Sequence, residues 1–255
     1  MKLITSNIRF DNPDDGSNGW DSRKSILADT LLSYSPTIIG TQEGRRPQLK
    51  ELENLLGNLQ LADTHREWIE RRMYPGQFFS PSSVALLRAT DVWLSDTPEI
   101  AGSKSFNSAF PRLCNIIEYI TLADQKKFLI CVVHLDHQLA QTRAEQARVL
   151  AEQLSKFNSE NLPFAVMGDF NEGPDDEVHS LLHKMLPGIR DPWIEKKLAE
   201  QTTYHKFKGS YPEGKRIDWI LLSNQFDVKS IEIDKHKSGD TFPSDHFPVR
   251  CEIEL

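Results

Sequence analysis

The chain has 255 residues, of which 38% are hydrophobic and 26% are charged, and its formal net charge is -7. This composition favours a globular, enzyme-sized protein and excludes a membrane helix, because no apolar run approaches the ~20 residues that such a helix requires. The acidic balance argues against binding to polyanions through bulk electrostatics, although a local patch or a bound cation can still hold a phosphate.

The first elements alternate between strand and helix. Residues 3–8 predict a buried strand with Asn7 near its end, and a helix is expected from about Asp21. Residues 37–43 predict a second buried strand that stops at the carboxylate Glu43. Polar residues at both strand ends, with a helix between the strands, are typical of an α/β layer.

The middle of the chain is less regular. A second helix is expected from about Pro47, after which the pattern weakens between Asp63 and Val92. Residues 95–112 are rich in Pro, Ser, Asn and Gly and predict a long surface loop, and long loops in compact enzymes tend to be functional. Two apolar runs follow and predict a hairpin, at residues 115–122 and 127–134.

The second half continues the alternation. A helix is expected over 140–157, a buried strand between Pro163 and Gly168 and a helix from about Asp175. The last third predicts further strands, at residues 202–205, 216–222, 228–233 and 247–253. No internal repeat or Pro-rich linker interrupts the chain, so we expect one domain over residues 1–255.

The cysteines and the N-terminus bear on the compartment. Cys114, Cys131 and Cys251 each lie in an apolar stretch without zinc-type spacing, which predicts small buried thiols in a reducing compartment. Met1 leads straight into the first strand and not into an apolar targeting segment with a cleavage site. We therefore expect a cytoplasmic protein.

The strongest chemical signal lies at the end of the strand that begins at Phe164. The apolar run breaks off at Gly168 and presents Asp169 and Asn171, which an extended chain would point to the same side. By itself this pattern is more often a turn than a site, because Asp and Asn both favour turns. The functional interpretation gains weight because other strands end in similar polar residues.

Glu43 and Asn7 are candidates for a metal site. Mg²⁺ is bound by one or two protein carboxylates together with water and phosphate oxygens, and a carboxamide oxygen can lie beside them. The alternatives are an exposed charge for Glu43 and a turn amide for Asn7, and spacing alone does not separate these interpretations.

Histidines mark two further strand ends. His134, followed by Asp136 and His137, suits either a transition metal or a neutral donor to a phosphate oxygen. Asp245 and His246 are adjacent and would face opposite sides of an extended chain, so His246 needs another carboxylate to orient it. Asp218 lies in the apolar strand over 216–222 and is the best candidate for that partner. The alternative for Asp218 is a surface pair with Arg216.

Together these residues closely resemble the exonuclease-endonuclease-phosphatase, or DNase I-like, superfamily, and within it a compact bacterial-type subgroup. The resemblance rests on six motifs in one order: Asn7, Gln42-Glu43, His134, Gly168-Asp169-Phe170-Asn171, Arg216-Ile217-Asp218 and Ser244-Asp245-His246. It implies an α/β fold, a four-layer αββα sandwich of two mixed sheets packed face to face with helices outside.

The resemblance also implies roles for individual residues. Glu43 would be the principal Mg²⁺ ligand, with Asn7 and Asp245 near the metal and Mn²⁺ as an acceptable substitute. His246, oriented by Asp218, would be the general base. Asp169 and Asn171 would position nucleophile and phosphate, His134 would donate to the phosphoryl oxygens or help the leaving group, and Arg45 and Arg112 would contact phosphate.

One position departs from the family pattern. The strand near Ser83 often carries a Glu or an aromatic residue beside the site, and this chain has neither there, so the sequence does not name the residue that orients His134.

The sequence thus predicts a Mg²⁺-dependent hydrolase of phosphate esters, with a phosphodiesterase or nuclease ranked first. The alternative is a phosphatase or phosphodiesterase for a small phosphorylated sugar, inositol or lipid headgroup, and an inactive binding module on the same fold ranks lowest. We expect a phosphate-ester substrate, with nucleic acid among the candidates, no insertion into a membrane and no obligate protein partner.

Overall fold

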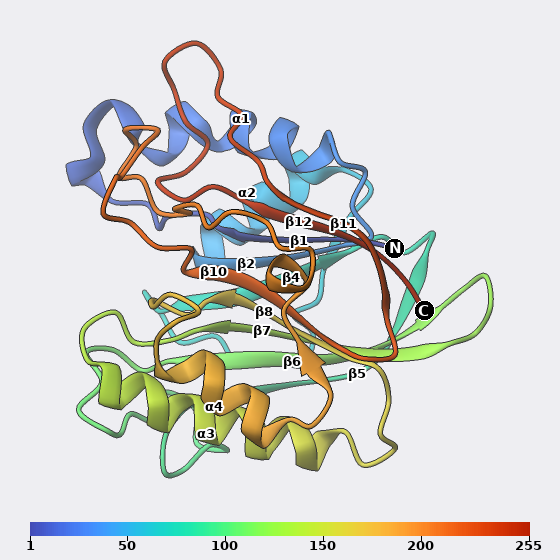
Figure 1. The fold of residues 1–255 in the computed structure, drawn as a ribbon. Coiled ribbons are helices and arrows are strands. Elements are labelled where there is room, and N and C mark those ends of the chain that lie inside the picture. The colour runs from blue at the N-terminus through green and yellow to red at the C-terminus, as the bar shows by residue number, and fades with distance from the viewer.

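In the computed structural model, which describes residues 1–255, two mixed β-sheets of six strands each pack face to face and helices cover both outer surfaces (Figure 1). This arrangement confirms the four-layer sandwich that the motifs imply. None of the helices has the length and apolar character that crossing a membrane demands.

The first sheet contains both ends of the chain. Its strand order is β11-β12-β1-β2-β4-β3, with β1 and β2 parallel and β1 antiparallel to β12. The strands are β1 (Lys2–Asn7), β2 (Ile38–Arg45), β3 (Gln60–Leu61), β4 (Met73–Phe79), β11 (Asp227–Ile233) and β12 (Val249–Glu254).

The second sheet has the strand order β5-β6-β7-β8-β10-β9, with β7 and β8 parallel and the other neighbouring strands antiparallel. Its strands are β5 (Val84–Trp93), β6 (Leu113–Thr121), β7 (Lys127–His134), β8 (Phe164–Asp169), β9 (Ile189–Arg190) and β10 (Asp218–Ser223).

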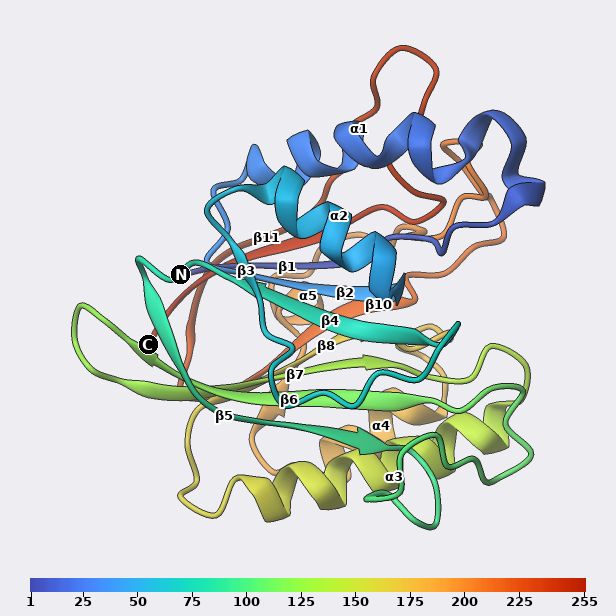
Figure 2. The ribbon, with the colours of Figure 1, turned by 180° about the vertical axis from the view of Figure 1, so that it is seen from behind.

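Helices cover the outer faces, as both views show (Figures 1 and 2). α1 (Trp20–Leu32) and α2 (Arg46–Leu56) lie on the first sheet, and α3 (Ala140–Phe157) and α4 (Glu177–Met185) on the second. A short helix, α5 (Pro192–Glu195), and a 3-10 helix over Pro13–Asn18 complete the elements. Each outer layer buries an apolar cluster beneath its helices, and a third cluster lies between the sheets.

The structure corrects two expectations about strands. β4 lies in the segment where the sequence pattern weakens, and Pro75 falls at a register shift against β2, where no ladder hydrogen bond is required of it. Residues 202–205 do not form a sheet strand, because Tyr204 makes only an isolated bridge to His246.

A buried ion pair ties the edges of the two sheets together. Arg66, which precedes β4, donates two hydrogen bonds to the Asp91 carboxylate of β5, at 2.7 and 2.8 Å, and a third to the carbonyl oxygen of Pro75 in β4. Asn115 of β6 also donates to Asp91. Although burial raises the pKa of Asp91, the Arg66 charge and the hydrogen bonds lower it to about 2.

We expect Asp91→Asn to lower the free energy of unfolding at pH 7 by about 3 kcal/mol, because it leaves a buried guanidinium without its counter-charge. The native pKa of Asp91 lies below the unfolded value, so its contribution is complete above about pH 4 and is lost as the pH falls towards 2. Urea denaturation should therefore show the difference between wild type and variant shrinking over that range. Asp240→Asn, at an exposed pair with Lys237, is the matched control and should show no such difference; an equal loss there would contradict the assignment.

Candidate active site

Polar residues from both sheets line a cavity of about 350 Å³ where β1, β2, β7 and β8 end. The structure brings most of the predicted site residues to this cavity: Glu43, Arg112, His134, Asp169, Asn171, Asp245 and His246. Asn7 and Asp218 are fully buried directly behind the lining, in hydrogen bonds to Asp169 and His246. Arg45 lines only an adjoining cavity.

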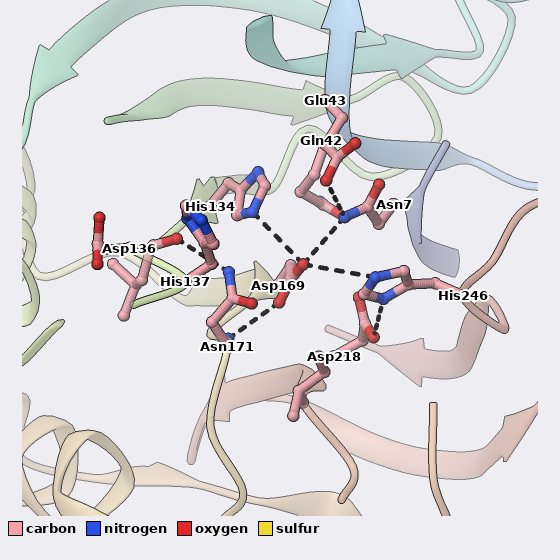
Figure 3. Close-up of polar contacts among 12 residues, drawn as sticks. Asn7, Gln42, Glu43, His134, Asp136, His137, Asp169, Asn171, Asp218 and His246 are labelled. Carbon is pink, nitrogen blue, oxygen red and sulfur yellow. Dashed lines mark hydrogen bonds and ion pairs between the residues drawn. The ribbon is translucent and has the colours of Figure 1, made fainter. Parts of the chain in front are cut away.

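Asp169 is the centre of the site (Figure 3). Its Oδ2 accepts a hydrogen bond from Asn7 Nδ2 at 2.9 Å and lies 3.5 Å from His134 Nε2 and 3.9 Å from His246 Nε2. Its Oδ1 accepts from the backbone N of Asn171 at 2.9 Å. Burial and the neighbouring Asp218 carboxylate raise the pKa of Asp169 to about 7. Two imidazole rings, one at the end of β7 and one in the segment before β12, thus point at one carboxylate oxygen.

His246 and Asp218 form the predicted pair. The distance from His246 Nδ1 to Asp218 Oδ2 is 2.8 Å, which leaves Nε2 directed into the cavity. Burial alone would lower the pKa of His246, but the charge and hydrogen bond of Asp218, with further carboxylates nearby, raise it to about 10. The alternative partner for Asp218 is wrong, because Arg216 is itself buried and pairs with Asp191 and Glu200.

Asp245 lines the same cavity as its neighbour His246. The expectation of opposite faces assumes an extended chain, and residues 244–246 lie instead in an irregular segment before β12. Ser244 fixes this segment, since its Oγ donates to the carbonyl oxygen of Asn7 at 2.6 Å.

Arg112 is the partner that orients His134. Arg112 Nη1 lies 3.0 Å from His134 Nδ1, and a guanidinium can only donate, so Nδ1 accepts and the ring proton lies on Nε2. Burial and the Arg112 charge also lower the pKa of His134 well below its usual value. His134 is therefore a neutral imidazole that directs an N–H towards Asp169. Asp136 does not line the cavity. Its Oδ2 accepts a hydrogen bond from the backbone N of Ala109 and so anchors the loop over 95–112.

Glu43 and Asp245 are acidic side chains without a cationic partner. No lysine or arginine lies within ion-pair distance of either, and Glu43 accepts only from Asn7 Nδ2 at 3.2 Å and from the backbone N of Phe10. Burial, with a contribution from the Glu43 charge, raises the pKa of Asp245. Asp245 is buried and Glu43 is partly buried, and this concentration of negative charge is costly unless a cation offsets it, so these oxygen donors fit a hard divalent ion.

Two details qualify the ligand set. The Oδ1 atom of Asn7 accepts from the backbone N of Arg9 at 3.0 Å, so Asn7 presents its amide nitrogen to the carboxylates. A second group of ligand-type atoms, from Asp169, Asp218 and His246, lies within 4.8 Å of one another, but Asp218 and His246 there already bond to each other.

Two candidate site residues have an unusual backbone conformation. Glu43 and Asn171 have φ values of 68° and 55°, in the left-handed region that non-glycine residues seldom adopt. Glu43 lies in the bulge where β2 shifts register against β4. At Gly168 a Cβ atom would lie 2.0 Å from the carbonyl oxygen of Val133, so only glycine fits there.

Several cavity residues have no counterpart among the sequence candidates: Arg9, Phe10, Met73, Phe110, His137, Tyr204 and Ile217. Arg9 and Phe10 directly follow the first strand end, which is a usable signal. Phe110 stacks on His137 with ring centroids 5.8 Å apart, and nothing in the local sequence indicates that contact.

Comparisons with known proteins agree with this geometry. A model of the endonuclease/exonuclease/phosphatase family matches residues 4–246. Among solved structures, a mannosyl-6-phosphatase from Bacteroides thetaiotaomicron VPI-5482 has 25% identity and a TM-score of 0.90, covering 100% of both chains. A functionally unknown conserved protein from Enterococcus faecalis V583 has 26% identity and a TM-score of 0.89, covering 100% of this chain and 99% of that one. TDP2 from D. rerio, complexed with a single strand DNA product, has 17% identity and a TM-score of 0.77, covering 100% and 99%. No curated protein sequence matches this chain at a significant level.

We expect Glu43→Gly to be more stable than Glu43→Ala by about 1 kcal/mol, because glycine adopts the left-handed backbone at this position without steric cost. Both variants lack the carboxylate, so the comparison isolates the backbone, and thermal unfolding measures it. At Glu232, an exposed position of β11 that pairs in register with Arg250, the order should reverse, with the glycine variant less stable than the alanine variant. The same order at both positions would show that the backbone at Glu43 is unstrained.

Proposed function

This chain belongs to the endonuclease/exonuclease/phosphatase family, a family of phosphoester hydrolases, and we propose that it is a Mg²⁺-dependent phosphoesterase in which His246 activates the attacking water. The observation that carries the proposal is the convergence of His246, His134 and Asn7 on Asp169 Oδ2.

His246 is the proposed general base. Asp218 occupies Nδ1, so the proton of the attacking water passes to Nε2. Asp169 lies close enough to His246 Nε2 to orient that water, and Asn7 fixes the Asp169 carboxylate in turn. The water oxygen forms a bond to phosphorus as the bond from phosphorus to the leaving oxygen breaks, and the alcohol takes its proton from solvent.

His134, Asn171 and Arg112 are the proposed donors to the phosphate. His134 carries its proton on Nε2 and can donate a hydrogen bond to a phosphoryl or leaving oxygen without adding a charge. Asn171 is anchored through its side chain to the carbonyl oxygen of Leu135 at 3.0 Å. Fixed donors of this kind stabilise charge that develops on the transferred phosphate.

Glu43 and Asp245 are the proposed ligands of the magnesium ion, with Asn7 beside them and Mn²⁺ as a substitute. A bound divalent ion supplies positive charge to the phosphate oxygens. A cation held by Glu43 and Asp245 would also offset the Asp245 charge, one of the carboxylate charges that raise the pKa of His246, and would thereby favour the neutral form that accepts a proton.

The substrate class is the finer part of the proposal. On sequence grounds a phosphodiesterase or nuclease ranks first. The structural similarity to TDP2, which was solved with a single strand DNA product, is consistent with that ranking. Two observations favour the alternative, a phosphatase for a small phosphorylated sugar. The site cavity of about 350 Å³ matches a small molecule, and the mannosyl-6-phosphatase aligns over the whole of both chains. An inactive binding module ranks lowest, since both the proposed base and the proposed metal ligands are present.

Two broader expectations stay predictions. The core shared between the two sheets supports one domain over residues 1–255. The three cysteines are all buried and unpaired, which supports a reducing, cytoplasmic location.

Replacing His246 by Ala should reduce Mg²⁺-dependent turnover by about 100-fold or more, since general-base catalysis contributes on the order of 10²–10⁴-fold. Magnesium binding, measured by calorimetry, should survive in this variant and weaken in Glu43→Ala. The assay uses p-nitrophenyl phosphate, bis-p-nitrophenyl phosphate, mannose 6-phosphate and single-stranded DNA. Exposed His236→Ala is the control. Unchanged turnover in His246→Ala would rule out the assigned base.

Arg112→Lys should lower kcat although it keeps the positive charge, because lysine cannot reach His134 and His137 with a rigid fork as Arg112 does. Nitrogen NMR of His134 should show the Nε2-protonated tautomer in the wild type and a mixture of tautomers in the variant. A wild-type spectrum with the proton on Nδ1 would contradict the proposed orientation.

A further inference from the structure

A second cavity of about 240 Å³ adjoins the active site and is strongly basic. It shares Glu43, Arg112, His134 and Phe110 with the site cavity, among other lining residues, and extends away from His246 and Asp169. Four arginines line it and Glu43 is its single carboxylate, in a chain whose net charge is -7. The arginines are Arg45, Arg71, Arg72 and Arg112.

These arginines are largely without counter-charges. Arg112 is 7% exposed, contacts only the two histidines His134 and His137, and leaves its Nε without a partner. No carboxylate lies within ion-pair distance of Arg45 or Arg72, and Arg71 only approaches the exposed Glu70 at 3.7 Å. Arg112 is buried, whereas Arg72 and Arg71, whose side chain is 89% exposed, are solvated; four guanidinium groups and a single carboxylate around one cavity nevertheless favour an anionic ligand there.

The fold holds part of this cluster in place. Arg45 ends β2 and pairs in register with Met73 of β4, which brings Arg71 and Arg72 beside it. Its Nη1 donates to the carbonyl oxygen of Asp11 at 3.2 Å, and its guanidinium carbon lies 4.9 Å from the Phe10 ring centre. The Arg45 side chain is thereby preorganised, which lowers the entropic cost of binding an anion.

The position of this cavity indicates which part of a substrate enters it. In a phosphoryl transfer the attacking and leaving oxygens lie roughly in line on opposite sides of phosphorus. The base His246 lines only the site cavity, whereas His134 and Arg112 lie on the wall that both cavities share. Water that attacks from the His246 side therefore drives the leaving group towards the arginines.

We propose that the basic cavity binds a phosphate group carried by the leaving alcohol, so that the preferred substrates are small bisphosphates such as sugar bisphosphates. The inference rests on the proposed function, because it assumes His246 as the base. Guanidinium groups match the paired oxygens of a phosphate, and four of them suit a dianion better than a neutral sugar.

A nucleic acid is the rival occupant, because the next phosphate of a strand would also lie on the leaving-group side. The arrangement favours the small molecule. Arg46, next to Arg45 in the chain, lies over the Trp68 ring, 5.7 Å from its centre, and does not line either cavity. Arg45, Arg71, Arg72 and Arg112 thus share one cavity, and the adjacent Arg46 does not extend their row.

The test compares matched substrates in the presence of Mg²⁺. For wild type, kcat/KM for propane-1,3-diol bisphosphate should exceed that for propane-1,3-diol monophosphate by about tenfold or more, which is the effect of one charge-assisted hydrogen bond. This ratio is larger than the factor of about two that arises because the bisphosphate has two equivalent phosphate groups. Glucose 1,6-bisphosphate and glucose 6-phosphate form a second pair. In the Arg71→Ala/Arg72→Ala double variant the ratio within each pair should fall to about threefold or less.

Arg46→Ala is the matched control and should keep the wild-type ratio, and thermal unfolding should show that all variants fold. Hydrolysis of the monophosphates with a ratio near one, or a ratio that the double variant leaves intact, would overturn this inference and leave the proposed function standing. No hydrolysis of any phosphate ester would overturn the proposed function itself. Cleavage confined to an oligothymidylate, and weakened in the double variant, would replace the small bisphosphate by a nucleic acid.

Discussion

The hydrogen bond from Asn7 to Asp169 joins the two sheets at the candidate active site. Asn7 ends β1 in the first sheet and Asp169 ends β8 in the second, and both side chains are buried. The face-to-face packing of the sheets brings these strand ends together, and the apolar cluster between the sheets holds them at that distance. The two imidazoles can converge on one oxygen only because this contact fixes where Asp169 lies.

The concentration of acidic groups is a constraint of a different kind. The partly buried Glu43 lies close to three buried carboxylates, Asp169, Asp218 and Asp245, and such a concentration costs free energy unless protons, hydrogen bonds or a cation offset the charges. The protein supplies a hydrogen-bonded imidazole to Asp218 and an amide to Asp169, and leaves Glu43 and Asp245 without a cationic partner. An arrangement that is costly by itself is thus suited to hold a metal ion and an anionic substrate together. The neighbouring cavity has the opposite balance, since four arginines and a single carboxylate line it, and this local surplus of positive charge favours an anionic ligand there.

Sequence reasoning predicted the fold, which the structure confirms, and named residues that gather at the candidate site, because both depend on local patterns. An apolar run that stops at a carboxylate, as at Glu43 and Asp169, is visible without knowledge of the rest of the chain. The order of six such motifs restricted the family. The sequence patterns did not indicate β4, because Pro75 and Gly76 oppose a strand assignment. Pairing with β2 and β3 decides the conformation there.

The partners of these residues were decided by tertiary structure. His134 and Asp169 were evident from the sequence, but the contact of His134 with Arg112 arises where the loop over 95–112 meets the end of β7. The proximity of Arg45 to Arg71 and Arg72 likewise follows from the register of β2 and β4. The sequence by itself therefore determined which side chains stand at strand ends, since periodicity is a property of each segment. Only the tertiary structure decided which of them touch, because register and sheet packing set distances between segments that are far apart in the chain.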